Sequence, residues 1–163
     1  MDLVRSRDLA EALVQSHAFR TETGIHALRG DPEAVEIVTD VAYYANLEIS
    51  YVWAYTLWRL QAVFEAIVTQ SFLPSSAKRP IGFSAKLKAV KAAGFNLSQE
   101  DERALLDWAR VRNQLSHEPE WYYHAEPITR EDVHEYLALL LRILDDWKGG
   151  GEFLPYAPEF SEA

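Results

Sequence analysis

The chain contains no cysteine, which excludes disulfide bonds, a thiol nucleophile and thiolate metal ligands. Long uncharged apolar runs are also missing, because Glu48, Arg59 and Glu65 interrupt the most apolar region, so no membrane span is expected. The first residues carry mixed charges instead of a basic start and an apolar run, so no secretory signal is expected. We therefore expect a cytoplasmic protein without membrane attachment.

Glycine and proline are absent from residues 33–73, and apolar residues recur there with a helical rhythm. The preceding Asp31-Pro32-Glu33 is a strong helix start, with an N-cap, a proline at the first helical position and an acid in the first turn. A helix of about forty residues would be ~60 Å long, more than the diameter of a small domain. The helix is therefore expected either to kink near residues 46–50 or to project towards a second subunit.

Four further helices are expected, the first over residues 3–19, followed by a break at residues 21–30. Ser84 can cap a short helix that stops at Gly94, and Ser98-x-x-Asp101 approximates a capping box for a helix that ends before Pro119. Thr129-x-x-Asp132 opens a last helix that runs to about Lys148, with seven residues on its buried side: Val133, Tyr136, Leu137, Leu140, Leu141, Leu144 and Trp147. The sequence thus predicts an all-α antiparallel helical bundle with one very long helix, as a single domain over residues 1–148 with a mobile tail at 149–163.

Acidic residues are missing from residues 66–99, although the chain as a whole has a net charge of −9. That segment carries Lys78, Arg79, Lys86, Lys88 and Lys91, so the rest of the chain sums to −14. A basic strip on an acidic body can guide a phosphate chain to one site. The more common situation is a solvated lysine face on a short helix, and the sequence leaves both interpretations open.

The most informative segment is Arg112-Asn113-Gln114-Leu115-Ser116-His117. Arg112 falls on one helical stripe with Leu105, Trp108, Ala109 and Leu115, so it is expected on the buried side of its helix. A guanidinium there requires a partner, and a phosphate suits its planar fork. His117 titrates near neutrality and can take and give a proton. Alternatively, Arg112 pairs with a carboxylate inside the bundle, and His117 only complements the helix dipole.

Residues 105–119, with this Arg-Asn-x3-His segment, resemble the motif helix of the HEPN superfamily. Residues 60–67 look like the long second helix of such domains and residues 84–90 like the short helix between them, so the resemblance covers about residues 35–148. It implies a helical bundle, usually a homodimer in which the two motifs meet across the interface. Many members are metal-independent endoribonucleases of toxin–antitoxin, abortive-infection and CRISPR-linked defence, whereas others bind or scaffold.

On this resemblance the expected substrate is single-stranded RNA, without cofactor or metal. His117 would handle protons at the attacking 2′-hydroxyl or the leaving oxygen, and Arg112 would stabilise the charge on the phosphate. Asn113 would either position the scissile group or hold the local helix end. One toxin branch has a tyrosine two residues after the histidine, which its antitoxin modifies. Here that position is Pro119, and Tyr122 and Tyr123 are out of register, so an antitoxin or other defence partner of that kind is only one option. The alternative function is an inactive, dimeric interaction module.

Three other features are candidates for a functional role. The first is a metal site. The spacing of Glu118 and His124 around His117 is not that of a zinc protease. The remaining histidines are scattered along the chain, so no metal site is expected: His17, His26 and His134. Aromatic residues crowd the long helix on all sides, and they either stack bases or, as is more usual, pack in a core and a subunit interface: Tyr43, Tyr44, Tyr51, Trp53, Tyr55 and Trp58. Glu65 either faces the motif helix and orients Arg112 or is a surface carboxylate.

Overall fold

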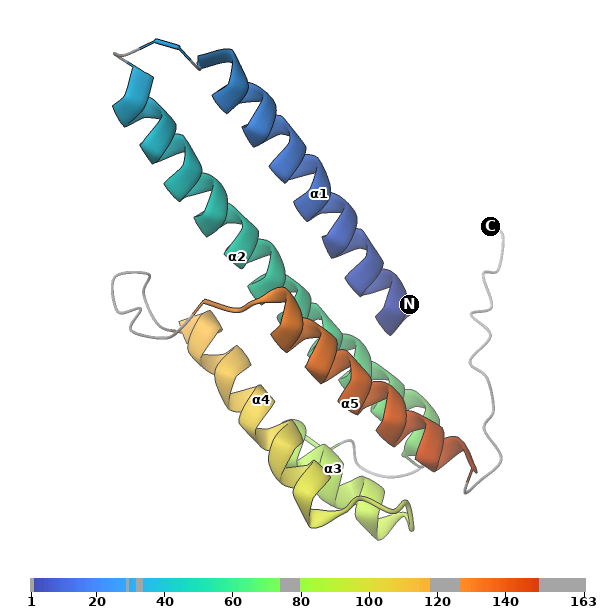
Figure 1. The fold of residues 1–163 in the computed structure, drawn as a ribbon. Helices are drawn as coiled ribbons and strands as arrows, with labels where there is room; N and C mark the ends of the chain where they lie inside the picture. The colour runs from blue at the N-terminus through green and yellow to red at the C-terminus, as the bar shows by residue number, and fades with distance from the viewer. Residues whose placement is uncertain (1, 29, 32–33, 74–79, 118–126, 150–163) are drawn as a thin grey trace, which may run out of the picture.

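The computed structural model describes residues 2–28, 30–31, 34–73, 80–117 and 127–149, and within these ranges every regular element is helical. Five α-helices and one π-helical turn follow one another along the chain: α1 (Leu3–Leu28), α2 (Val35–Ile67), η2 (Val68–Phe72), α3 (Phe83–Ala92), α4 (Gln99–His117) and α5 (Arg130–Gly149). The predicted all-α bundle with one very long helix is confirmed (Figure 1). Within the described ranges, none of these helices is long and apolar enough to span a membrane.

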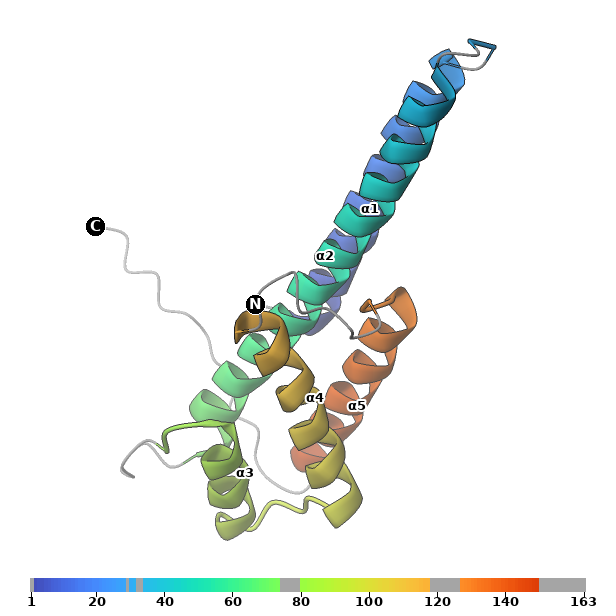
Figure 2. The same cartoon turned by 90° about the vertical axis from the view of Figure 1, so that its left-hand side faces the viewer.

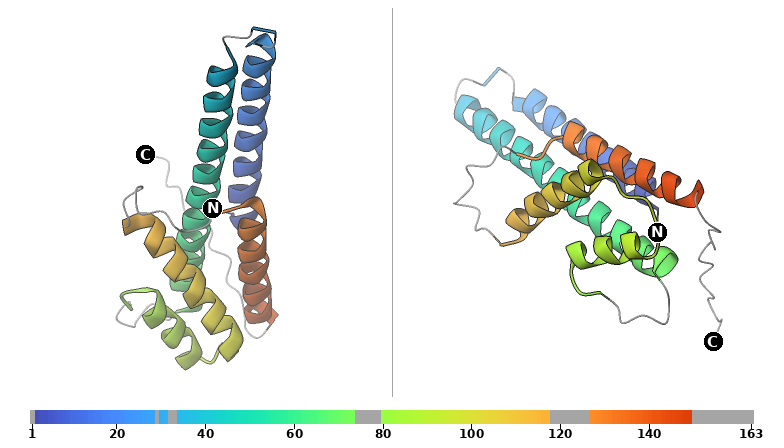
Figure 3. Two further views of the ribbon diagram at one scale, coloured as in Figure 1. Left: turned by 60° about the vertical axis from the view of Figure 1, so that its left-hand side comes forward. Right: turned by 90° about the horizontal axis from the view of Figure 1, so that it is seen from below.

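The helices α1 and α2 form an antiparallel pair that extends well beyond the other three helices (Figures 2 and 3). We call the projecting part of this pair the arm. The expected break at residues 21–30 is wrong over most of its length, because α1 continues to Leu28. Gly24 weakens a helix by only about 1 kcal/mol, and α1, which packs against α2, keeps half-buried residues beyond it, Ile25 and Leu28.

The long helix is not interrupted at residues 46–50, so the expected alternative of a kink there is wrong. Its 33 residues correspond to about 50 Å of rise. The N-terminal half lies along α1 and the C-terminal half enters the body of the molecule (Figure 2). The long helix α2 is therefore longer than the body of the molecule, and its N-terminal half projects as part of the arm. Contact between the arm and a second subunit stays a prediction.

The body of the molecule consists of α3, α4 and α5 packed around the C-terminal half of α2. Trp147 of α5 lies at the centre of an aromatic cluster, with its ring centroid 5.2 Å from that of Phe72 and about 6 Å from those of Phe64 and Phe95. Its indole Nε1 donates to the backbone oxygen of Asn96 at 2.6 Å, so the buried ring is satisfied at its polar end. This core fixes α5 and the start of α4 against α2.

Three predicted helix ends are confirmed by their hydrogen bonds, but the predicted caps Asp31 and Ser84 are wrong. The residue before α2 is Ala34 and the residue before α3 is Gly82, and neither helix start has a side-chain cap. Ser98 Oγ accepts from the backbone N–H of Asp101 at 3.0 Å, and Asp132 accepts from both the N–H and the hydroxyl of Thr129. Gly94 has a φ of +94°, and the bonds from Gly94 N–H to Lys91 and from Phe95 N–H to Val90 form the paired closure of a Schellman end. These caps set where α4 and α5 begin.

The last helix ends within one residue of its predicted end, and the prediction of its buried side holds for six of the seven residues. Leu141 is only half-buried, and Ile143, which was not predicted, is 2 % exposed. Residues 150–163 of the predicted tail lie outside the described part of the chain.

Candidate functional site

The motif helix α4 lies against the middle of α2, and its buried side carries the predicted stripe. Leu105 is fully buried, Ala109 is 7 % exposed, and Trp108 is half-buried with its ring 5.3 Å from that of Tyr136. One turn further on, Arg112 and Leu115 are half-buried. The hydrophobic anchor of α4 therefore weakens towards its C-terminal end, where the motif residues begin to reach the surface.

Arg112 is held by an aromatic ring and by its neighbour, and not by a carboxylate. Its guanidinium carbon lies 5.5 Å from the ring centroid of Trp58 of α2, which is a cation–π contact. One terminal nitrogen donates to Asn113 Oδ1 at 2.9 Å. Among the described residues no carboxylate lies within ion-pair distance of Arg112, so the expected alternative of a buried ion pair is not observed there. A half-buried guanidinium in this position retains its full positive charge towards solvent.

The other two motif residues lie at the surface end of the helix. Asn113 is exposed, and its amide oxygen is occupied by Arg112. His117 is the last residue of α4, and its side chain lies outside the described part of the chain. Glu118, Pro119, Tyr122, Tyr123 and His124 lie outside it as well. The structure thus brings Arg112 and Asn113 together and fixes the backbone that carries His117.

Three residues on α2, α4 and α5 carry buried polar atoms, and we call them the polar seam: Gln61, Arg112 and Tyr136. Gln61 Oε1, Arg112 Nε and the Tyr136 hydroxyl are each buried without a hydrogen-bond partner among the described residues. Burial raises the pKa of Tyr136, and the negative charge of Glu65 raises it further while the charge of Arg112 opposes this. The phenol is therefore a neutral group at physiological pH that faces both charges.

Glu65 does not orient Arg112 directly. It accepts from Lys86 Nζ at 2.7 Å and from Gln61 Nε2 at 3.1 Å, and its side chain is 19 % exposed. Neither of the two interpretations made from the sequence is right, because Glu65 ties α2 to α3 as a partly buried ion pair. Sequence spacing does not reveal this contact, which joins residues 21 positions apart.

The basic segment is less free than its composition suggests. Lys86 pairs with Glu65 and Lys91 pairs with Glu102 of α4, each at 2.7 Å, whereas Lys88 is exposed. Lys78 and Arg79 lie outside the described residues. Among the described lysines of the segment, two of three are thus committed to holding α3 in place.

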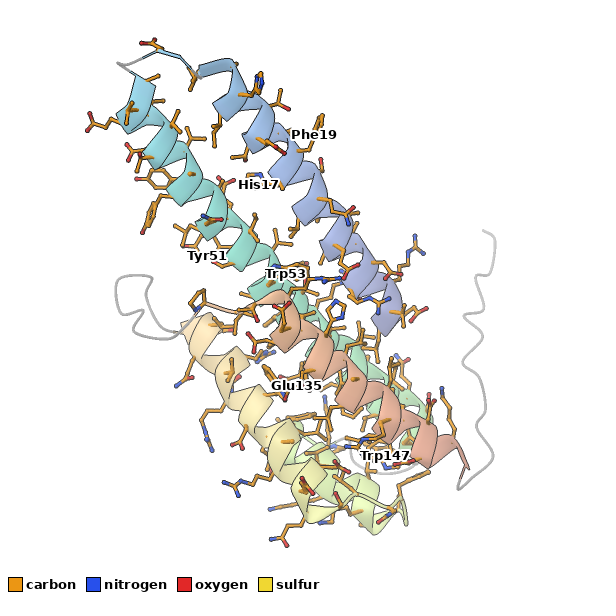
Figure 4. All side chains as sticks on the ribbon, in the orientation of Figure 1. His17, Phe19, Tyr51, Trp53, Glu135 and Trp147 are labelled. Carbon is orange, nitrogen blue, oxygen red and sulfur yellow. The ribbon has the colours of Figure 1, made fainter. Side chains whose placement is uncertain are left out.

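The scattered histidines have structural contacts. His17 Nε2 lies 3.1 Å from Glu48 between α1 and α2, and His134 Nε2 lies 2.8 Å from Glu11 (Figure 4). Glu11 also accepts from Arg130, and these hydrogen bonds lower the pKa of its carboxyl group. In the part of the chain that is described, no three histidine, aspartate or glutamate side chains gather as a ligand set for a metal ion.

The aromatic residues of α2 divide into two core residues, Trp53 and Phe64, and five exposed ones. Trp53 is 5 % exposed and belongs to the core. The other five are 40–64 % exposed, so the interpretation as core packing is wrong for them in the single chain: Tyr43, Tyr44, Tyr51, Tyr55 and Trp58. Trp58 is the member that touches the motif, through Arg112, and its ring stacks at 20° on that of Tyr55 with centroids 6.2 Å apart.

No family model, curated protein or solved structure matches this chain.

Proposed function

We propose that the protein is a metal-independent endoribonuclease of the HEPN type that cleaves single-stranded RNA in a toxin–antitoxin or antiviral defence system. The observation that carries the proposal is the state of Arg112. It is half-buried, backed by the Trp58 ring, and no described carboxylate neutralises it. A preorganised cation of this kind suits a phosphodiester whose charge increases during the reaction.

In the proposed mechanism the 2′-oxygen attacks the adjacent phosphorus and the bond to the 5′-oxygen breaks. The products end in a 2′,3′-cyclic phosphate and a 5′-hydroxyl. His117 takes the proton of the 2′-hydroxyl or gives one to the leaving 5′-oxygen, and Arg112 stabilises the charge on the non-bridging oxygens. Asn113 holds the guanidinium through its Oδ1 and so acts as a positioning residue.

The proposal includes a homodimer. Arg112 and His117 are five positions apart, which corresponds to about 140° around an ideal helix, so one pair does not converge by itself. Two motifs that face each other across a two-fold axis can supply an arginine from one protomer and a histidine from the other.

The alternative function is an inactive dimeric interaction module. It is favoured by the five exposed aromatic side chains of α2, because exposed aromatic residues in this number usually serve association. In that case Arg112 and Trp58 would only build the interface.

The test is cleavage of varied single-stranded RNAs in EDTA, with analysis of the product ends. Arg112→Ala and His117→Ala are each expected to lower the rate by at least about a hundredfold, the usual effect of losing a charge-stabilising or proton-transfer group. Arg110→Ala is the matched control, because Arg110 lies on the same helix, is 73 % exposed and pairs with Asp107. It should retain the wild-type rate, and DNA should resist cleavage because it lacks the 2′-hydroxyl.

Each other outcome has a defined meaning, provided that the variants keep the helical circular dichroism of the wild type. Cleavage that survives His117→Ala would assign the activity to another site. A wild-type protein that is inert on varied RNAs and harmless when overexpressed would favour the interaction module.

A further inference from the structure

One side of α2 is apolar except at Glu48, and we call it the α2 stripe. Its members recur every three or four residues on either side of Glu48, which places them on one side of the helix: Ile37, Val41, Tyr44, Tyr51, Tyr55, Trp58, Ala62 and Ala66. The six large members are 37–59 % exposed. Leu9 and Leu13 of α1 extend this surface, and they border a groove of about 350 Å³ beside Tyr51 and Tyr55. An apolar surface of this extent marks an association site.

The stripe is complementary to itself in size. Its large side chains lie towards the arm and its small ones, Ala62 and Ala66, towards the body. If a second copy of α2 runs antiparallel and the two helices cross at Tyr55, residues equally far from Tyr55 in the sequence face each other. Tyr44 then lies opposite Ala66 of the partner, and Glu48 opposite its Ala62. Alternating large and small residues across facing positions is the pattern that lets helices interdigitate.

One charge is complementary in the same register. Between Val35 and Trp58, α2 carries three acids and no lysine or arginine: Glu36, Asp40 and Glu48. Two cations lie just past Tyr55, where Arg59 donates to Ser6 and Arg112 covers Trp58. The partner's Glu48, opposite Ala62, comes within about one helical turn of Arg59, whereas its Asp40 and Glu36 lie beyond Ala66. The same acids oppose an RNA strand along the arm, because they repel phosphates.

We infer that a second copy of this chain docks on the α2 stripe, with its α2 antiparallel and a two-fold axis close to Tyr55. This inference rests on the proposed function and specifies the interface that the proposed composite site requires. In this arrangement the two-fold axis is perpendicular to the plane that contains the two α2 helices. Both α4 helices therefore lie on the same side of that plane. Trp58 is three residues from Tyr55, about 4.5 Å along the helix. The two copies of Arg112 therefore face each other near the axis.

The absence of native cysteine makes the register directly testable. Tyr55→Cys is expected to cross-link to its own copy in the partner with a short bismaleimide, because it lies at the axis. Tyr44→Cys should not cross-link to itself, since the two copies would be about 33 Å apart along the antiparallel helices. Mixed with Ala66→Cys protein, Tyr44→Cys should cross-link efficiently. Phe19→Cys is the control, because Phe19 is 71 % exposed on the outer side of α1 and should give no dimer (Figure 4).

Several results would overturn the inference. A Tyr44→Cys protein that cross-links to itself would indicate parallel helices, and cross-linking of Phe19→Cys as fast as of Tyr55→Cys would indicate random collision. A wild-type protein that sediments as a monomer at micromolar concentration would remove the interface altogether, and protection of the exposed tyrosines by RNA in that monomer would assign the stripe to RNA instead. Should Tyr55→Cys not fold, the mixed pair of Glu48→Cys and Ala62→Cys tests the same register.

The interface and the activity fail separately. A specifically cross-linked dimer that does not cleave RNA would retain the interface and refute the proposed function. An active enzyme whose Tyr55→Cys and mixed Tyr44→Cys proteins do not cross-link would retain the ribonuclease and refute this interface. Arg112→Ala is expected to remain dimeric while losing activity, so its sedimentation separates the two roles.

Discussion

Removal of the Tyr136 hydroxyl is expected to leave the protein equally stable or to stabilise it, which is opposite to the usual effect of Tyr→Phe at a buried site. A hydroxyl that makes a hydrogen bond usually contributes about 0.5–1.5 kcal/mol, and that amount is lost in phenylalanine. Tyr136 is fully buried, and its hydroxyl has no hydrogen-bond partner among the described residues. A buried polar group without a partner costs about 1–3 kcal/mol. Phenylalanine removes this cost and keeps the ring contact with Trp108.

The expected result for Tyr136→Phe is a gain of 0 to about 2 kcal/mol in the free energy of unfolding, after allowance for the dispersion contacts of one lost oxygen. The assay is urea unfolding followed by circular dichroism, at the same protein concentration for every variant because the proposed dimerisation would contribute to stability. Tyr43→Phe is the matched control, since Tyr43 is 64 % exposed and the change keeps its ring contact with Tyr44. It should change stability by less than about 0.5 kcal/mol.

A loss of about 1 kcal/mol or more in Tyr136→Phe would refute this reasoning. It would show that the hydroxyl is bonded in solution, either within the polar seam or through a bound water. Arg112 Nε is a buried donor of the seam without a partner among the described residues, so a bond between it and the Tyr136 hydroxyl would also change the account of Arg112. Its orientation would then depend on α5 as well as on Trp58.

Two further predictions concern the frame that holds the site. Gly94→Ala should lower the free energy of unfolding by about 1 kcal/mol because Gly94 has a φ of +94°, whereas Gly24→Ala inside α1 should raise it by about 0.5–1 kcal/mol. Nothing lies within 4 Å of the added carbon at either position, so backbone conformation decides both effects. Urea unfolding that shows a change of the same sign for both variants would contradict this. The hydrogen bond from Arg142 lowers the pKa of Asp101 below its ordinary 3.8. The contribution of this ion pair to folding stability is therefore fully present above pH 3.8 and is lost as the pH falls through the lowered pKa of Asp101. Asp101→Asn should therefore be less stable than wild type at pH 6, and the difference in stability should shrink below about pH 3.8. The measurement is a series of unfolding midpoints at different pH values. A stability difference that does not change with pH would exclude this ion pair as its cause.

The parts of the fold that were predictable are those fixed by local chemistry. Ser98, Thr129 and Gly94 act on backbone groups only a few residues away, so their sequence context was sufficient to locate the ends of three helices. The buried side of α5 was predictable because one amphipathic period runs through it without interruption.

Apart from the predicted caps at Asp31 and Ser84, the errors concern long-range partners. Gly24 is a break signal locally, but α2 offers α1 a continuous surface past it, and tertiary packing outweighs about 1 kcal/mol of propensity. The aromatic residues of α2 give no periodic signal, because some face the core, as Trp53 does, and others face solvent, as Tyr55 does. The partner of Glu65 is Lys86, on a different helix. Neither spacing nor composition encodes such pairings, which follow only once the helices are arranged in space.

Trp58 is the residue that joins the candidate site to the proposed interface. Its ring faces Arg112 on one side and stacks on Tyr55, a member of the α2 stripe, on the other. Covering the stripe with a second protomer would exclude water from the Trp58 ring, and a cation–π contact strengthens when it is desolvated. Assembly would then fix Arg112 more firmly than the single chain does. On this basis Arg112 would reach its final position only in the proposed dimer, which would link the activity of the proposed enzyme to its association.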